Sequence, residues 1–156
     1  MKMNGKIIEG PVPEVIVIPK GENEFVFKAL PVLDFAPFEE LCKTPVAPTI
    51  VKKGGETFPD FDDKGYNEAL TAWAKKKNAW TVITSLKATD DLEWETVTEG
   101  DPETWPNYLT ELQKIFADAE VSLILDIVYI ANGMNQKKID DATKRFLAGQ
   151  GQDQNT

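Results

Sequence analysis

The stretch "DAEVSLILDIVYIANG", residues 118–133, decides the fold that this sequence predicts. Asp118 is a suitable N-cap residue, and Gly133 is a typical residue to end a helix. The apolar residues between Val121 and Ile130 cover nearly every face of the helix that they would form. We therefore expect a central buried helix here, with the other elements arranged around it.

The segments on either side of this stretch also have helical periodicity. In "DPETWPNYLTELQKIF", residues 101–116, Asp101 predicts an N-cap and Pro102 the first helical position. The apolar stripe of that helix comprises Trp105, Tyr108, Leu109, Leu112, Ile115 and Phe116. In "NQKKIDDATKRFLAGQ", residues 135–150, Asn135 predicts the cap and Gly149 the stop. Its apolar side comprises Ile139, Ala142, Phe146 and Leu147.

A longer helix is expected over residues 66–88, "YNEALTAWAKKKNAWTVITSLKA". Lys75 and Lys76 would point away from its apolar stripe, whereas Lys77 could lay its aliphatic stem beside the stripe. The run of three lysines is typical of a solvated helix face. The stripe comprises Tyr66, Leu70, Trp73, Trp80, Ile83 and Leu86.

The N-terminal part of the chain has the composition of β-structure. Two runs rich in Val, Ile and Phe, separated by "KGEN", predict a β-hairpin over residues 14–30. A short helix is expected over residues 34–43, with Asp34 as its N-cap. Its core-facing residues would be Phe35, Phe38, Leu41 and Cys42, so that Cys42 is a small apolar core residue.

Prolines and a glycine pair interrupt residues 44–65, which predicts an irregular loop. Within it, "TIV" and "ETF" could pair as a small hairpin across the glycines. A contact loop and a disordered insert both remain open. The fold class is therefore α+β, with an N-terminal β-hairpin followed by a predominantly α-helical domain of about five helices. Residues 1–150 would form a single domain with a helical core over 66–148, and 151–156 a polar tail.

Composition excludes several classes of function. The formal charge of −9, from 17 basic and 26 acidic residues, disfavours nucleic acid and anionic membranes as partners. The chain contains no histidine and one cysteine, so a His-based triad and a thiolate zinc site are excluded. The first 14 residues lack the apolar h-region of a signal peptide, so we do not expect export, and no run of about 20 apolar residues occurs. These features favour a reducing cytoplasm.

The stretch "LEWETVTEGDPETW", residues 92–105, has two competing interpretations. Carboxylates such as Asp90, Asp91, Glu93 and Glu95 could form a divalent-metal or acid/base site. Alternatively, Trp94 and Trp105 anchor a helix connection in the core while the carboxylates face water. The spacing of the acids does not match that of an EF-hand loop. Burial of each indole removes roughly 150–250 Å² from water. We therefore prefer the structural interpretation.

The C-terminal half resembles a known protein family. The succession "AWTVITSL", "DLEWETV", "DPETWPNYLTEL" and "AEVSLILDIVYIANGMNQKKIDDATKRFLAGQ" is similar to tail assembly chaperones of long-tailed, siphovirus-type bacteriophages. In this family a tryptophan-bearing segment precedes helices that end in a phrase like "AN…ID.A...FL.GQ". The resemblance covers about residues 79–150, and the hairpin would be the family's N-terminal part.

The resemblance implies a non-enzymatic protein of the host bacterial cytoplasm. Such chaperones coat the long tape measure protein, help recruit tail tube subunits and leave before the virion matures. The tape measure protein is thus the implied partner, with the tail tube protein and self-association as further candidates. The family implies no cofactor and no catalytic residue. Many members also exist with a frameshifted extension, and this chain resembles the short form.

An apolar groove between helices could cover one face of a tape measure helix. The candidate groove residues are Trp73, Trp80 and Tyr108, although core packing is an alternative assignment for each. Two other functions remain open. One is a structural phage tail or neck protein that stays in the virion, and the other is a small acidic metal-dependent enzyme.

Overall fold

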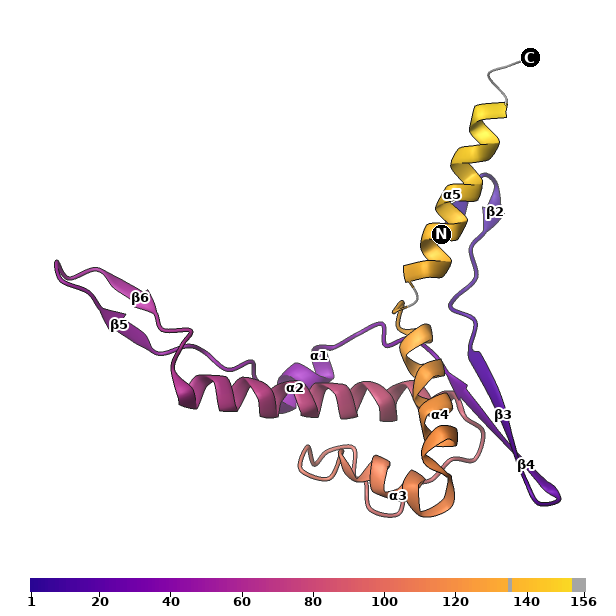
Figure 1. The fold of residues 1–156 in the computed structure, drawn as a ribbon, viewed down its shortest axis with the longest axis horizontal. Coiled ribbons are helices and arrows are strands. Elements are labelled where there is room, and N and C mark those ends of the chain that lie inside the picture. Colours follow the sequence, from indigo (N-terminus) through magenta and orange to yellow (C-terminus); the bar gives the residue numbers. More distant parts are fainter. Residues whose placement is uncertain (135, 153–156) are drawn as a thin grey trace.

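The computed structural model of the protein describes residues 1–134 and 136–152, and its central element is helix α4 (Asp118–Ala131). This helix contacts the β-hairpin and helices α2 and α3 (Figure 1). Its inner face is buried and consists of Val121, Ile124, Ile127 and Val128. The opposite face is open, since Leu123 is 48% exposed. The predicted central position is therefore confirmed, but the prediction of burial on nearly all faces is wrong.

Local hydrogen bonds fix both ends of α4. Asp118 is its first helical residue and Ala117 the N-cap, so the predicted cap is one residue off. The Glu120 carboxylate accepts the Ala117 N–H at 2.9 Å. At the other end, Gly133 has φ +81° and donates its N–H to Ile130, while Met134 donates to Tyr129. This is a Schellman motif, and it confirms Gly133 as the end of the helix.

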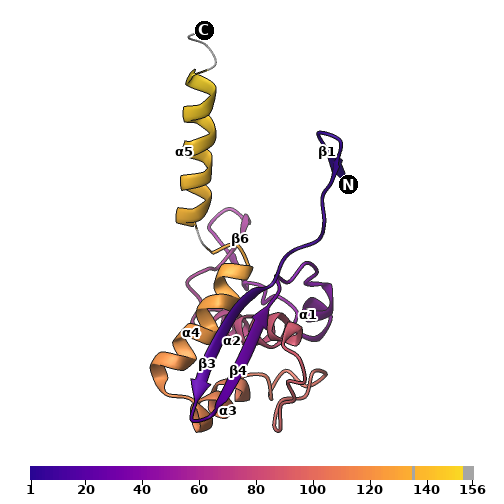
Figure 2. The same ribbon diagram turned by 90° about the vertical axis from the view of Figure 1, so that its right-hand side faces the viewer.

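The predicted hairpin consists of β3 (Glu14–Lys20) and β4 (Asn23–Ala29). The antiparallel register pairs Lys20 with Asn23, which leaves a two-residue turn at Gly21–Glu22. Gly21 has φ +62°, as the first position of a type II′ turn requires. One face of the hairpin packs on α4 and buries Ile18, Phe27 and Ala29. Figure 2 shows both strands beside α4.

Two smaller hairpins project from the body. One is formed by β1 (Lys2–Met3) and β2 (Lys6–Ile7), and the other by β5 (Thr49–Val51) and β6 (Thr57–Pro59). The second lies within residues 44–65, so the irregular loop is wrong there and the alternative small hairpin is confirmed. Gly54 and Gly55 have φ of +110° and +83° at its tip. In Figure 1 it extends beyond the start of α2.

Helix α1 (Ala36–Leu41) lies against the middle of α2 (Figure 1). Phe35 occupies its N-cap position, although the Asp34 carboxylate still accepts the Ala36 N–H at 2.9 Å. Phe38 is completely buried, and Cys42 is buried as predicted. Burial raises the pKa of the Cys42 thiol. The expectation for Leu41 is wrong, because its side chain is 47% exposed.

Helix α2 (Lys64–Ser85) begins two residues before its predicted start, because the Asp63 carboxylate caps it by accepting the Tyr66 N–H at 2.7 Å. A 3₁₀ turn, η1 (Leu86–Ala88), continues it. Only the C-terminal part of the predicted stripe is buried, namely Trp80, Ile83 and Leu86. The Lys77 ammonium lies 5.0 Å from the Phe35 ring centre, as predicted for a lysine beside the stripe.

Helix α3 (Asn107–Ile115) begins six residues after the predicted cap at Asp101. Residues 101–106 form successive turns instead, in which Asp101 accepts the Glu103 N–H. Pro106 explains the difference, because it has no N–H to donate to Pro102 and disfavours helical backbone at Trp105. The stripe of this segment still buries Trp105, Tyr108, Leu112 and Phe116, whereas Ile115 is 54% exposed.

Helix α5 (Gln136–Gln152) extends away from the body in both ribbon views (Figures 1 and 2). All its residues from 136 to 151 are exposed, so the prediction of a helical core reaching 148 is wrong and the buried core ends with α4. The helix also continues past Gly149, the predicted stop. The predicted cap Asn135 and residues 153–156 of the polar tail lie outside the described residues. The α+β fold class is confirmed.

Candidate functional site

Two of the three predicted groove residues, Trp80 and Trp73, belong to an aromatic cluster between α1 and α2. Trp80 is only 8% exposed, and its ring centre lies 5.5 Å from that of Phe35 and 5.7 Å from that of Phe38. Trp73 is half-buried and donates its indole N–H to the Cys42 carbonyl at 3.2 Å. Phe35 and Trp73 line a shallow pocket of about 410 Å³ near the end of α4.

The third residue, Tyr108, lies elsewhere. Its side chain is 5% exposed and its ring packs edge-on against Trp94, with 6.5 Å between ring centres. Burial, with a smaller contribution from Tyr129, raises the pKa of Tyr108 to about 12. Tyr108 and Trp73 line separate pockets on the two sides of α2 residues Ala74 and Asn78. The structure therefore does not bring the three residues into one groove, and their role in binding stays a prediction.

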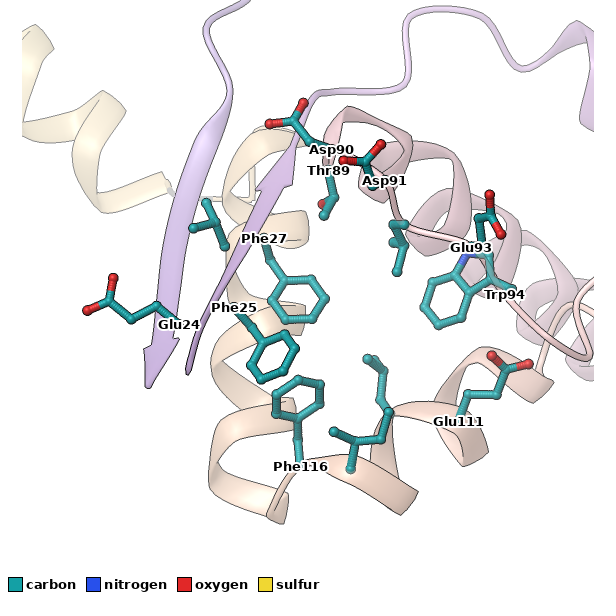
Figure 3. Close-up of a pocket in the computed structure, with 14 residues that line it drawn as sticks. Glu24, Phe25, Phe27, Thr89, Asp90, Asp91, Glu93, Trp94, Glu111 and Phe116 are labelled. Carbon is teal, nitrogen blue, oxygen red and sulfur yellow. The ribbon is translucent and has the colours of Figure 1, made fainter. Parts of the chain in front are cut away.

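A different apolar groove opens between β4, residues 89–94 and α3, and we call it the β4–α3 groove (Figure 3). Its volume is about 540 Å³. The rings of Phe25 and Phe27 contact Phe116 edge-on, with ring centres 5.7 and 5.5 Å apart. Trp94 faces these three rings from the other side of the groove. Its apolar lining consists of Phe25, Val26, Phe27, Leu92, Trp94, Leu112, Ile115 and Phe116.

Carboxylates surround this groove. Asp90, Asp91, Glu93 and Glu111 lie around its opening and form what we call the acidic rim, whereas Glu24 points outward from the hairpin (Figure 3). The groove lining contains neither lysine nor arginine. Lys28 forms an ion pair with Asp90 from outside the lining, at 2.7 Å. The groove therefore combines an apolar floor with a negative edge.

Hydrogen bonds hold one member of the acidic rim, Glu111, in place. The Glu111 carboxylate accepts the N–H groups of Glu95 and Thr96, at 3.0 and 2.6 Å, and the Thr96 hydroxyl. Burial opposes ionisation of Glu111, but these hydrogen bonds outweigh it and lower the pKa of the carboxyl. Asp91 has φ +57°, a left-handed conformation that Asp tolerates better than most residues. The segment that carries Leu92 and Trp94 is thus fixed against α3.

Residues 92–105, which contain two tryptophans and five acidic residues, have the arrangement of the structural interpretation, with indoles in the core and carboxylates in water. Trp105 is completely buried and donates its indole N–H to the Glu99 carbonyl at 3.0 Å. Trp94 is half-buried, while Glu93, Glu95, Glu99, Asp101 and Glu103 are exposed. Within residues 1–134 and 136–152, no three acidic or cysteine side chains gather as possible metal ligands.

Sequence reasoning missed the β4–α3 groove, although it identified most of its residues as members of apolar faces. Phe25 lies on the inner face of the hairpin, and Ile115 and Phe116 lie on the stripe of α3. The only local signal for an open site was the alternation of Leu92 and Trp94 with acids.

Among the described residues, no helix has the length and apolarity to cross a membrane. Comparisons with protein-family models, curated proteins and solved structures found no match to this chain.

Proposed function

We propose that this chain is a tail assembly chaperone of a long-tailed bacteriophage. It would bind the tape measure protein in the cytoplasm of the infected host and promote assembly of the tail tube without catalysing a reaction. The β4–α3 groove is the observation that carries this proposal, because it presents aromatic and aliphatic side chains on an open surface. The resemblance of residues 79–150 to that family gives the proposal its particular partner.

The groove suits an amphipathic helix as its ligand. Helix-in-groove recognition uses apolar anchors at positions i, i+3, i+4 and i+7, which a groove of about 540 Å³ with aromatic walls can accept. The acidic rim adds a preference for helices whose apolar stripe is bordered by Lys or Arg, since opposite charges steer association and reject like-charged partners. Covering such stripes until the tail tube encloses them would prevent aggregation of the tape measure protein.

The proposal is tested by expressing the tape measure protein of the same phage with and without this chain. The wild-type chain should increase the soluble fraction of the tape measure protein and remain bound during purification. Ile115→Glu places a charge on the groove floor at a position that is already 54% exposed, so we expect it to abolish both effects without unfolding the chain. Val46→Glu is the matched control, because Val46 is 88% exposed and lies outside the groove.

Two further results would contradict the proposal or its site. If Trp73→Gln abolishes tape measure binding while Ile115→Glu does not, the predicted aromatic site is the correct one and the groove assignment is wrong. If mass spectrometry of purified virions finds the chain at a stoichiometric level, it is a retained structural component, because a chaperone leaves before the particle matures.

A further inference from the structure

Helix α5 has a combination of properties that the body of the protein lacks. Its apolar residues Ile139, Phe146 and Leu147 are 51%, 63% and 58% exposed. Together with Ala142 they occupy positions i, i+3, i+7 and i+8, which lie on one face of a helix. This face is an apolar stripe of the kind that normally packs in a core.

The charge of α5 is opposite to that of the rest of the chain. The helix has four basic side chains, Lys137, Lys138, Lys144 and Arg145, and two acidic ones, which gives a net charge of +2 in a chain of net charge −9. Lys144 and Arg145 immediately precede Phe146 and Leu147 of the stripe. Arg145 is also the only arginine of the sequence.

We propose that α5 of one copy of this chain docks into the β4–α3 groove of a second copy. The stripe of α5 supplies apolar anchors at helical spacing, and the groove supplies the aromatic floor that would receive them. Lys138 and Arg145 lie beside Ala142 at one edge of the stripe, whereas Asp140 lies beside Leu147 at the other edge. The basic edge would face Asp91 and Glu93 of the acidic rim, because Asp90 already pairs with Lys28 and Glu111 accepts hydrogen bonds from Glu95 and Thr96. One orientation of the helix would therefore place the stripe on the groove floor and the basic edge at the rim.

The position of α5 favours a second copy over the groove of its own chain. The groove lies at the N-terminal end of α4, where Phe116 precedes the helix by two residues, whereas α5 follows the C-terminal end. A helix of 14 residues separates these ends by about 21 Å. Figure 1 shows α5 directed away from α3.

Helix and groove are different surfaces, so the contact between two copies is head-to-tail. Such a heterologous contact leaves one free helix and one free groove in every dimer, and further copies can add to both ends. The association would also occupy the groove before a client helix arrives. The inference does not require the client to be a tape measure protein, because it concerns the purified chain alone.

The first test measures the mass of the purified full chain by light scattering and analytical ultracentrifugation over a range of concentrations. The wild-type chain should exceed its monomer mass of 17.4 kDa as the concentration rises, and high salt should weaken the association. Phe146→Glu removes an anchor of the helix, and Ile115→Glu blocks the groove floor. Each should raise the dissociation constant about tenfold or more, as expected for loss of a central apolar anchor. The Val46→Glu control should associate like the wild type.

Mixing the two variants tests the pairing itself. The Phe146→Glu chain keeps an intact groove, and the Ile115→Glu chain keeps an intact α5. Together they can form one helix–groove contact, so the mixture should give a heterodimer and no larger species. Far-UV circular dichroism of each variant verifies that it is folded.

Three results would overturn the inference. The wild-type chain could stay monomeric at all concentrations, or it could associate without any effect of the two substitutions. The third result is that each variant is monomeric alone and the mixture of the two variants is also monomeric. The copies would then not pair helix to groove. Failure of the proposed function is distinguishable, because Phe146→Glu leaves the groove intact and should still solubilise the tape measure protein.

Discussion

The hydroxyl of Thr89 takes the place of a neighbouring strand at the edge of the hairpin. Its Oγ1 accepts the Lys28 N–H at 2.9 Å and donates to the Lys28 carbonyl at 3.0 Å. Both backbone groups belong to β4 on the edge that β3 does not cover. Thr89 is only 9% exposed, so water has little access to replace it. Substitution of Thr89 by Val keeps the shape of the side chain and removes both hydrogen bonds.

The expected loss of stability follows from these two bonds. Each contributes about 1 kcal/mol net, and leaving the N–H and the carbonyl of Lys28 partly buried without a partner costs roughly another 1–2 kcal/mol. Thr89→Val should therefore lower the free energy of unfolding by about 3–4 kcal/mol. For a domain of this size, 1 kcal/mol corresponds to about 2–4 °C in Tm, so Tm should fall by roughly 6–16 °C.

Urea unfolding followed by tryptophan fluorescence and circular dichroism measures this loss. The midpoint should fall while the m-value stays constant, because the surface exposed on unfolding is unchanged. Thr89→Ser is the matched control, since it keeps the hydroxyl and loses one methyl group, at a cost of about 1 kcal/mol or less. If Thr89→Val is within about 0.5 kcal/mol of Thr89→Ser, the hydroxyl does not hold the edge of β4 and the reasoning is wrong.

Two further predictions concern a half-buried amide, that of Asn132, and a buried phenol, that of Tyr108. The Asn132 side chain accepts the Val32 N–H at 2.9 Å and donates to Ser85 and Val128 at 2.9 and 2.7 Å. Because Asn132→Leu removes all three hydrogen bonds, it should lower the free energy of unfolding, measured in urea, by roughly 2–4 kcal/mol. Asn132→Asp, which keeps only the acceptor for Val32, should be intermediate, and equal stability of all three chains would contradict this assignment. Because burial raises the pKa of Tyr108 to about 12 from an ordinary value of 10, its contribution is complete below pH 10 and is lost as the pH rises toward 12. Unfolding measured from pH 9 to 12 should therefore show a smaller decline for Tyr108→Phe than for the wild type, whereas parallel declines would rule out this origin.

The sequence was a good guide where structure depends on local interactions. Gly133 marks the end of α4 correctly, because the Schellman hydrogen bonds involve only residues 129–134. The hairpin over residues 14–30 was predictable because a short turn fixes its register. The predicted start of the helix at Asp101 failed for an equally local reason. Pro106 removes a hydrogen-bond donor, and its effect outweighs a favourable cap.

The candidate site was less predictable, because it depends on which apolar faces other elements cover. Trp80 and Tyr108 lie on helical stripes, and residues distant in sequence bury both, namely Phe38 and Trp94. Phe25 and Ile115 have the same pattern, yet 40% and 54% of their surfaces remain exposed. Periodicity identifies a face that needs an apolar neighbour, and only the tertiary arrangement shows which neighbour is missing.

Helix α5 shows where this ambiguity becomes informative. Its stripe predicts core packing, but residues 136–151 are exposed, so an apolar partner would have to come from outside the chain's own core. The helix also needs such a partner for its own stability. An isolated helix of about 15 residues is marginal in water, and Gly149 and Gly151 each cost about 1 kcal/mol relative to Ala. Docking would bury the stripe and stabilise the helical conformation at the same time. Association and the helix content of α5 should therefore be coupled. A client helix that occupies the β4–α3 groove would exclude α5 of the second copy, and the helix content of α5 should then fall.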